Sequence, residues 1–282
     1  MKYKIFDKNQ LEIKPEHDEL YILWLGGASF YIKDSAGNKM LIDPYLSNSA
    51  YDYMKPFVKN PKKSLSRLDK PVFGPGDLET DFILTTHDHL DHLDPYTIKE
   101  YRNLKNVIFV GPPSCCNHFE RIGIKRDKII ELKAGESIRL VKDIVVFGTY
   151  AKHRGPFDLE KSMLEKSEVY GSDDSIGFLV NFGNISVYHT GDTSFEDALF
   201  DIENKKIDVL LLGANGVADN LTPEEGALLT KRLKPKMVIP QHYGVIPCTN
   251  FDPISLVEVF EKYHIDSSLV ILKINESVIF KK

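Results

Sequence analysis

The feature that most constrains this chain is a dense run of histidines and aspartates, Thr86-His87-Asp88-His89-Leu90-Asp91-His92. Imidazole and carboxylate groups together suit zinc, manganese or iron. Side chains alternate along an extended backbone, so His87, His89 and Asp91 are expected on one side, and His92 joins them where the chain turns. The apolar segment 82–84 precedes the run, and Asp94-Pro95 follows it as N-cap and first position of a helix over 96–102. The local prediction is a strand, a ligand-bearing loop and a helix.

Three isolated histidines have a different interpretation. A lone histidine is usually a surface or hydrogen-bonded residue, and this is the prediction for His17, His118 and His264. A histidine-rich tract in low-complexity sequence also binds metal adventitiously. The run at 87–92 lies instead between an apolar segment and a capped helix, which favours a built metal site.

Composition excludes several classes of protein. The 282 residues can form a substantial core, and no linker divides them, so we expect one domain over 1–282. A formal net charge of −5 does not favour nucleic-acid binding. No segment has the length and apolarity of a membrane span or signal peptide, so no membrane partner is expected. Cys115, Cys116 and Cys248 are too sparse for a disulfide framework, which predicts a cytoplasmic protein.

The order of strands and helices predicts an α/β fold. Strands are expected at 20–25, 29–33, 39–43, 107–110, 128–132, 137–140, 144–150, 176–182, 185–189, 207–212, 237–239, 269–274 and 278–280, and helices at 113–122, 194–203, 222–233 and 253–263. Two mixed sheets packed face to face, with helices outside, would bury these apolar strands on both faces. Residues 44–76 show no clear periodicity, and such a long irregular segment is a candidate substrate loop.

One loop does not complete a catalytic metal site, so further donors are expected at other strand ends. His153, Asp192 and His242 each follow an apolar strand, where the site residues of layered α/β folds gather. An isolated aspartate in a turn is usually an Asx-turn residue, which is the alternative for Asp192. Its place in a pattern shared with two histidines favours the metal-site interpretation.

These motifs resemble the metallo-β-lactamase superfamily, whose signature H-x-H-x-D-H matches His87, His89, Asp91 and His92. The similarity is greatest to the L-ascorbate-6-phosphate lactonase family. Besides the Thr86–His89 stretch, it is carried by Trp24-Leu25-Gly26, Val141-Lys142-Asp143-Ile144, Asp173-Asp174, Tyr188-His189, Gly191-Asp192 and Val238-Ile239-Pro240. The chain departs from the lactonases at Gly27, where they have cysteine, at His153, where they have an acidic residue, and at Tyr243, where they have histidine.

The resemblance implies a four-layer αβ/βα sandwich with a metal site at one edge between the sheets. It implies one cation on His87, His89 and His153, a second on Asp91, His92 and His242, and Asp192 between them. Asp43 matches an aspartate that orients a ligand histidine, and His189 is expected as buried support. One or two divalent ions are expected, zinc or manganese first and iron as the alternative.

The donors predict hydrolysis of a small molecule. Two nearby cations lower the pKa of a shared water from about 15.7 to near 7, and Asp91 is the candidate catalytic residue that orients it or accepts its proton. The hypothesis is a small ester or lactone, with a sugar-phosphate lactone as the phosphorylated form. A two-metal phosphodiesterase acting on nucleotides or phospholipids, and a metal-binding protein without turnover, are the alternatives. A homo-oligomer is left open.

Basic residues near the irregular segment are weaker candidates for phosphate binding. They are Lys55, Lys59, Lys62, Lys63 and Arg67, together with Arg154 beside His153. A solvated charged face is the alternative for the lysines, since such side chains are mostly exposed. Cys115-Cys116 is expected to serve helix packing.

Overall fold

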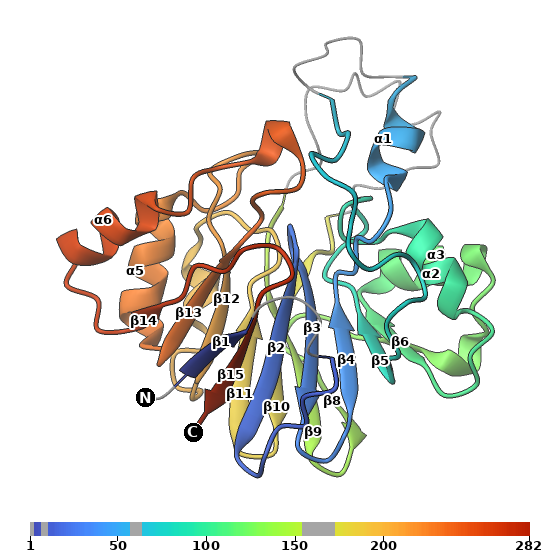
Figure 1. Cartoon of the computed structure of the whole chain (residues 1–282), viewed down its shortest axis with the longest axis horizontal. Coiled ribbons are helices and arrows are strands. Elements are labelled where there is room, and N and C mark those ends of the chain that lie inside the picture. The colour runs from blue at the N-terminus through green and yellow to red at the C-terminus, as the bar shows by residue number, and fades with distance from the viewer. Residues whose placement is uncertain (1–2, 7–10, 57–63, 154–172) are drawn as a thin grey trace.

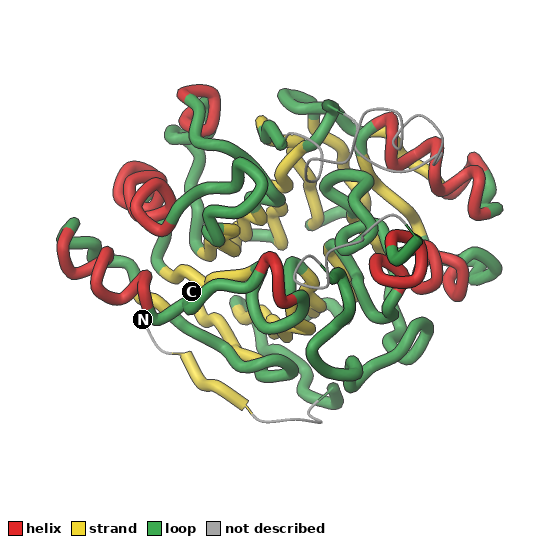
Figure 2. Tube along the Cα trace, turned by 90° about the horizontal axis from the view of Figure 1, so that it is seen from above, coloured by secondary structure: helices red, strands yellow, loops and turns green. Residues whose placement is uncertain are grey.

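The computed structural model describes residues 3–6, 11–56, 64–153 and 173–282, and shows two mixed β-sheets flanked by helices (Figure 1). Seen from above, the strands of the two sheets form the centre and most of the helices lie on the outside at both flanks (Figure 2). The expected sandwich architecture is therefore confirmed.

The first sheet is formed largely by the N-terminal half of the chain. Within the described residues it has eight strands in the order β1-β15-β2-β3-β4-β5-β6-β7. They are β1 (Tyr3–Phe6), β2 (Glu19–Gly26), β3 (Ser29–Asp34), β4 (Lys39–Ile42), β5 (Phe82–Leu84), β6 (Ile108–Gly111), β7 (Ile129–Glu131) and β15 (Ser277–Lys281). Strands β4 to β7 are parallel, and the others pair antiparallel. The carboxyl ends of β4, β5 and β6 consequently share one edge.

The second sheet has seven strands among the described residues, in the order β14-β13-β12-β11-β10-β9-β8. They are β8 (Ser137–Val141), β9 (Ile144–Tyr150), β10 (Ile176–Phe182), β11 (Ile185–His189), β12 (Val209–Gly213), β13 (Met237–Gln241) and β14 (Ser268–Leu269). Strands β11 to β14 are parallel, which brings the ends of β11, β12 and β13 to one edge. The β10–β11 hairpin turns at Gly183-Asn184, as expected.

Apolar side chains fill the space between the sheets and beneath the helices. Trp24, Phe30, Phe178 and Met237 are among the fully buried residues of the central core. Outside the first sheet lie α2 (Pro95–Tyr101) and α3 (Pro113–Ile122), whose Cys115 and Cys116 pack there as expected; α5 (Pro223–Leu233) and α6 (Ser255–Lys262) cover the second. None of the described helices has the length and apolarity needed to cross a membrane.

Some of the expected elements are wrong. Residues 194–203 form only the short 3-10 helix η3 (Asp197–Phe200), because the Ser194 amide donates to Lys152 O and Glu196 is extended. The strand expected at 269–274 ends at Leu269, since the chain there crosses from one sheet to the other. The irregular segment contains a helix, α1 (Ser49–Met54), and the N-terminal strand β1 was not expected. Residues 57–63 of that segment lie outside the described residues.

Candidate metal centre

The histidine-rich run is a compact loop rather than an extended chain. Strand β5 ends at Leu84, and the amides of His92 and Leu93 both donate to His89 O, at 2.9 and 2.7 Å. The expectation that alternate side chains of an extended backbone face one side is therefore wrong. The turn itself brings the donors together: His87 Nε2 lies 2.9 Å from His89 Nδ1. Asp94 then caps α2 by accepting from the Tyr96 amide, as expected.

Three strand ends of the second sheet bring donors to the same place. His153 follows β9, Asp192 follows β11 and His242 follows β13. Asp192 Oδ2 lies 3.2 Å from His242 Nε2 and 3.7 Å from His153 Nε2. Asp192 Oδ1 lies 3.5 Å from His92 Nε2, on the loop from the other sheet. The seven expected donors thus meet where the carboxyl ends of both sheets face one another.

Three groups of these donors could each hold a metal ion, their ligand atoms lying within 4.8 Å of one another. They are His87, His89 and His153; His87, His92 and Asp192; and Asp91, His92 and His242. The first and third match the two cation positions implied by the resemblance, and the second overlaps both. All seven side chains are buried except that of Asp91, which is half-buried.

Asp43 fixes the orientation of the loop. Its Oδ1 accepts from the Thr86 amide at 2.7 Å, and its Oδ2 accepts from Thr86 Oγ1 at 2.7 Å and from His92 Nδ1 at 2.8 Å. His92 Nδ1 therefore donates to Asp43, and Nε2 is the ring nitrogen that faces the other donors. Thr86 Oγ1, having donated to Asp43, accepts from His87 Nδ1 at 3.0 Å, which gives His87 the same orientation.

The electrostatics separate the histidines into two kinds. Burial, and then the neighbouring His92, lower the pKa of His87 well below its usual value, and burial with His153 lowers the pKa of His89 to about 4. Burial also lowers the pKa of His153. For His92, burial is outweighed by Asp192 and Asp43, which raise its pKa well above the usual value. Burial likewise opposes the charge of His242, but Asp192 raises its pKa. His87, His89 and His153 are therefore neutral, whereas His92 and His242 would release a proton to a bound cation.

An unpartnered carboxylate oxygen among the donors also indicates a cation site. Asp192 Oδ1 is buried without a hydrogen-bond partner in the described part of the chain. Burial disfavours the Asp192 charge, but His242 and His92 hold its pKa well below the usual value, so the carboxylate stays ionised. A buried anionic oxygen without a donor is costly unless a positive charge faces it, which supports a divalent ion here.

Backbone strain accompanies two of these residues. Asp43 has φ 45° and His242 has φ 70°, both in the left-handed region that side chains with a Cβ rarely adopt. His242 is held there by its amide, which donates to Gly27 O at 2.8 Å. Such conformations persist where the surroundings impose them, typically at functional sites.

The remaining histidines agree with their expectations. His189 Nε2 donates to Ala28 O at 2.9 Å and its Nδ1 accepts from the Gly191 amide, so it is buried support for the turn before Asp192. His17 and His264 are exposed, and His118 is buried with Nε2 3.5 Å from Asp88.

Two asparagines at the centre were missed by the sequence analysis. Asn215 Nδ2 lies 3.0 Å from His242 Nδ1, and Asn220 Nδ2 donates to Asp192 Oδ2 at 2.8 Å. Both belong to the loop after β12, so the strand-end rule that selected Asp192 and His242 was sufficient to find Asn215.

The candidate phosphate-binding residues lie in different surroundings. Arg67 stacks on the Tyr45 ring, its guanidinium carbon 4.8 Å from the ring centroid, and Nη1 donates to Tyr45 O at 2.9 Å. Lys55 is exposed, 3.8 Å from Asp52. Lys59, Lys62, Lys63 and Arg154 lie outside the described residues.

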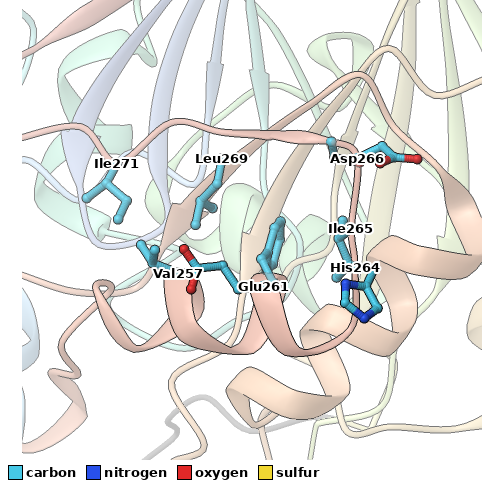
Figure 3. A pocket seen from close by; sticks show the side chains of 9 residues that line it. Val257, Glu261, His264, Ile265, Asp266, Leu269 and Ile271 are labelled. Carbon is cyan, nitrogen blue, oxygen red and sulfur yellow. The ribbon is translucent and has the colours of Figure 1, made fainter.

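The structure has a small cavity beside the candidate metal centre and a larger groove away from it. A cavity of about 10 Å³ adjoins it, lined by Gly27, Tyr45, Asp91, His242, Tyr243, Val245, Ile246 and Thr249. A larger open groove of about 680 Å³ runs along α6, with Val257 and Glu261 on one side and Leu269 and Ile271 on the other (Figure 3). The groove contains none of the seven donors, so the chemistry belongs to the smaller cavity.

Comparisons with known proteins agree with this fold. Residues 21–242 match the β-lactamase superfamily domain. A UPF0173 metal-dependent hydrolase of Archaeoglobus fulgidus is 32% identical over 266 residues, covering 93% of this chain and 99% of the relative. Another, from Thermodesulfovibrio yellowstonii, is 30% identical over 276 residues and covers 91% of both chains. The solved structure of Igni18, a metallo hydrolase of Ignicoccus hospitalis, has a TM-score of 0.69 at 21% identity, covering 94% of this chain and 99% of that one.

The chain belongs to the metallo-β-lactamase superfamily. It is a metal-dependent hydrolase, similar to the UPF0173 hydrolases along nearly its whole length, with His/Asp clusters that could bind metal ions.

Proposed function

We propose that this hydrolase opens a small lactone or cleaves a small ester, with a sugar-phosphate lactone as the preferred substrate class. His87, His89 and His153 would hold one divalent cation, and Asp91, His92 and His242 a second, with zinc, manganese or iron as the ion. The observation that carries the proposal is the Asp192 carboxylate, whose Oδ2 lies 3.7 Å from His153 Nε2 of the first position and 3.2 Å from His242 Nε2 of the second. That geometry lets one side chain reach both positions.

Divalent cations bound at these positions supply a nucleophilic water at neutral pH and polarise the attacked oxygen. Asp91 is the catalytic residue of this proposal, because its half-buried carboxylate, 3.6 Å from His242 Nε2, lines the cavity where substrate would enter. It orients the attacking water and accepts its proton. In the reaction a bond forms between the water oxygen and the carbonyl carbon, the ring C–O bond breaks, and the proton passes to the departing oxygen, giving the hydroxy acid.

The cavity is large enough only for the reacting group of a substrate. Its volume of about 10 Å³ corresponds to roughly one water molecule. Tyr45, Val245 and Ile246 form a buried apolar cluster on this side of the centre. Reacting groups alone would fit there, with the rest of the substrate toward solvent.

Arg67 is the described basic residue best suited to a phosphate. It has no carboxylate within ion-pair distance among the described residues, and only its Nε and one Nη1 proton are used, on Asp69 O and Tyr45 O. An arginine with remaining donors and no carboxylate in direct contact is suited to bidentate phosphate binding. Tyr45 connects it to the cavity that Asp91 lines.

The test is an assay of metal-loaded chain on a sugar-phosphate lactone, the same lactone without phosphate, and bis(p-nitrophenyl) phosphate. We expect lactone turnover, with a kcat/KM at least 10-fold higher for the phosphorylated form. Arg67→Gln should remove most of this difference, since a hydrogen bond to a charged group contributes about 1.5–3 kcal/mol.

His87→Asn and Asp192→Asn are expected to lose bound metal and activity together, whereas His17→Gln, which changes an exposed histidine, should lose neither. Phosphodiester turnover without lactone turnover would replace this proposal with the phosphodiesterase alternative. Bound metal without turnover of any ester would favour a metal-binding protein.

A further inference from the structure

The second sheet ends at an edge whose hydrogen-bonding groups are open. Strand β14 is the last strand of this sheet, and among the described residues it pairs only with β13. The Val270 amide donates to Val238 O at 2.8 Å, so the even-numbered residues of the segment face β13. Successive residues of a strand turn their N–H and C=O groups to opposite sides, and those of Leu269 and Ile271 therefore point outward. Neither has a backbone hydrogen bond in the part of the chain that the structure describes.

This edge is also apolar. Val270 and Leu272 are at most 2% exposed and belong to the central core. Leu269 and Ile271 are half-buried, and both side chains point toward α6 across the groove (Figure 3). Edge strands are usually protected from other chains by a charge, a proline, a bulge or a covering segment. The edge from Leu269 to Leu272 has neither a charge nor a proline, so it is suited to pairing with another strand.

Charges of opposite sign stand at the two ends of the apolar run. Asp266 precedes β14 and Lys273 follows Leu272, and both charged side chains are exposed. Neither has an ion-pair partner among the residues that the structure describes. An antiparallel copy of the same segment would bring Lys273 of each copy to the Asp266 end of the other. The edge is therefore complementary in charge to itself.

A two-fold axis at Val270 gives a complete pairing of two such edges. About this axis, Leu269 of one copy lies opposite Ile271 of the other, and the two residues exchange both N–H and C=O groups, as hydrogen-bonded pairs of an antiparallel ladder do. Ser267 then lies opposite Lys273, next to Asp266. Shifting the register by one residue would set outward groups against inward ones, so the pairing is specific.

We propose that the open edge, residues 267–273, is a dimerisation surface on which a second copy of this chain adds the same segment antiparallel. The second sheets of the two copies then join into one. Leu269 and Ile271 of both copies lie on its outer face between the two α6 helices, whose Ile254 and Val257 are 62% and 38% exposed. Because each copy uses the same surface, the contact closes at two chains. The groove contains none of the seven metal donors, so both centres stay open.

The wild-type chain gives the first test without any substitution. Sedimentation equilibrium should give a mass of about twice the 32.1 kDa of one chain. Hydrogen exchange of the Leu269 and Ile271 amides should be slower in the dimer than in the monomer by about 10-fold or more. The Val270 amide, which is bonded to β13 in each copy, should exchange at the same rate in both states.

Charge reversal tests the register of the pairing. Lys273→Glu should raise the dissociation constant of the dimer about 10-fold or more, because like charges then meet at both ends of the paired segments. Adding Asp266→Lys to this variant restores opposite signs and should return the dissociation constant to within about 3-fold of wild type. Lys125→Glu is the matched control, since it makes the same charge change at an exposed residue after α3.

Leu269→Pro tests the backbone pairing separately, because it removes an outward N–H that β13 does not use. The folded variant should be monomeric.

Several outcomes would overturn the inference. They are a wild-type chain that remains at 32.1 kDa, a dimer that Lys273→Glu does not weaken, and a dimer in which the Leu269 and Ile271 amides exchange as in the monomer. A monomeric chain that binds an extended peptide of another protein at this edge would overturn it as well. Each of these results leaves the proposed function standing, because the metal centre lies outside the groove.

Discussion

The two sheets build the centre in different ways. The first sheet contributes four donors from one loop after β5, held by Asp43 and Thr86 through carboxylate and hydroxyl groups. The second contributes three donors from three strand ends, and its buried partners for two of them are the amides of Asn215 and Asn220. A local loop and a distributed set of strand ends thus meet at one point.

Proximity along the sequence and support in the fold are therefore separate properties of the donors. In the local half, Asp43 accepts from His92 Nδ1 and so turns Nε2 toward the other donors. The distributed half depends on the relative position of three strands, and His242 reaches the centre from a strained backbone tied to the β2–β3 turn by Gly27 O. Substitutions in the two halves should therefore have different consequences.

The largest effect is expected at Asp43. Asp43→Ala leaves the buried Thr86 amide and His92 Nδ1 without acceptors, and each such group costs about 1–3 kcal/mol. We expect the free energy of unfolding, measured by urea denaturation, to fall by about 3 kcal/mol or more. Asn220→Ala, which removes a single donor to Asp192 in the second sheet, should cost about half as much or less. Equal losses of unfolding free energy in Asp43→Ala and Asn220→Ala would contradict the view that the two sheets support their donors differently.

Gly26 tests the contact between the halves. At φ 97°, a Cβ on this residue would lie 2.7 Å from Val245 Cγ2, a buried and stiff side chain next to His242. Gly26→Ala should cost about 1–2 kcal/mol in backbone strain and about 1–3 kcal/mol more in overpacking. Gly37→Ala is the matched control, since it has φ 90° and no atom within 4 Å of its Cβ.

Gly26→Ala and Gly37→Ala should therefore both lose the unfolding free energy that corresponds to backbone strain, measured by thermal or urea unfolding. The additional loss should appear only for Gly26→Ala, together with weaker zinc binding, because Gly27 O holds the His242 amide. Matching values for the two variants would mean that the sheets meet here without mutual constraint.

The smallest effect concerns the opposite ends of the second sheet's parallel strands. Asp208 is fully buried before β12, accepts from the Ser186 amide and lies 3.0 Å from Lys236 Nζ. Burial opposes its charge, but Lys236 and its other partners keep its pKa below the usual value of about 3.9. Its stabilisation is therefore present above about pH 4 and is lost as the pH falls through the lower folded-state pKa.

Asp208→Asn should thus flatten the acid side of the stability profile below about pH 4, measured as urea midpoint against pH. Zinc binding at neutral pH should remain as in wild type, because the residue lies away from the donor edge. If the urea midpoint of Asp208→Asn depended on pH below about pH 4 as it does in wild type, Asp208 would not contribute to acid-dependent stability.

The sequence was sufficient for the strand-end donors and for most strands because both depend on local patterns. Apolar runs such as 176–182 form strands wherever a sheet can bury them, and a polar residue directly after such a run marks the sheet edge. The 87–92 run was informative for the same reason, although its turn geometry was not foreseen.

The features that could not be predicted from the sequence depend on contacts between distant segments. Asn215 resembles any loop asparagine until β12 and β13 lie in register and bring it to His242. The segment 194–203 has helical periodicity, but Lys152 O, from another strand end, takes the Ser194 amide. The 269–274 segment has strand composition, but after Val270, whose amide donates to Val238 O, it crosses from one sheet to the other.

Strand β15 has a consequence for how the molecule folds. It lies between β1 and β2, pairing Ser277 with Leu23 and Val278 with both Ile5 and Ile22, so the first sheet contains a pairing that spans almost the whole polypeptide. Pairings of such long range form slowly because the loop must close before any contact compensates for its entropy. On a translating ribosome, β1 would have no partner until residues 277–281 emerged, and during that interval the edge of β2 would be open to other chains.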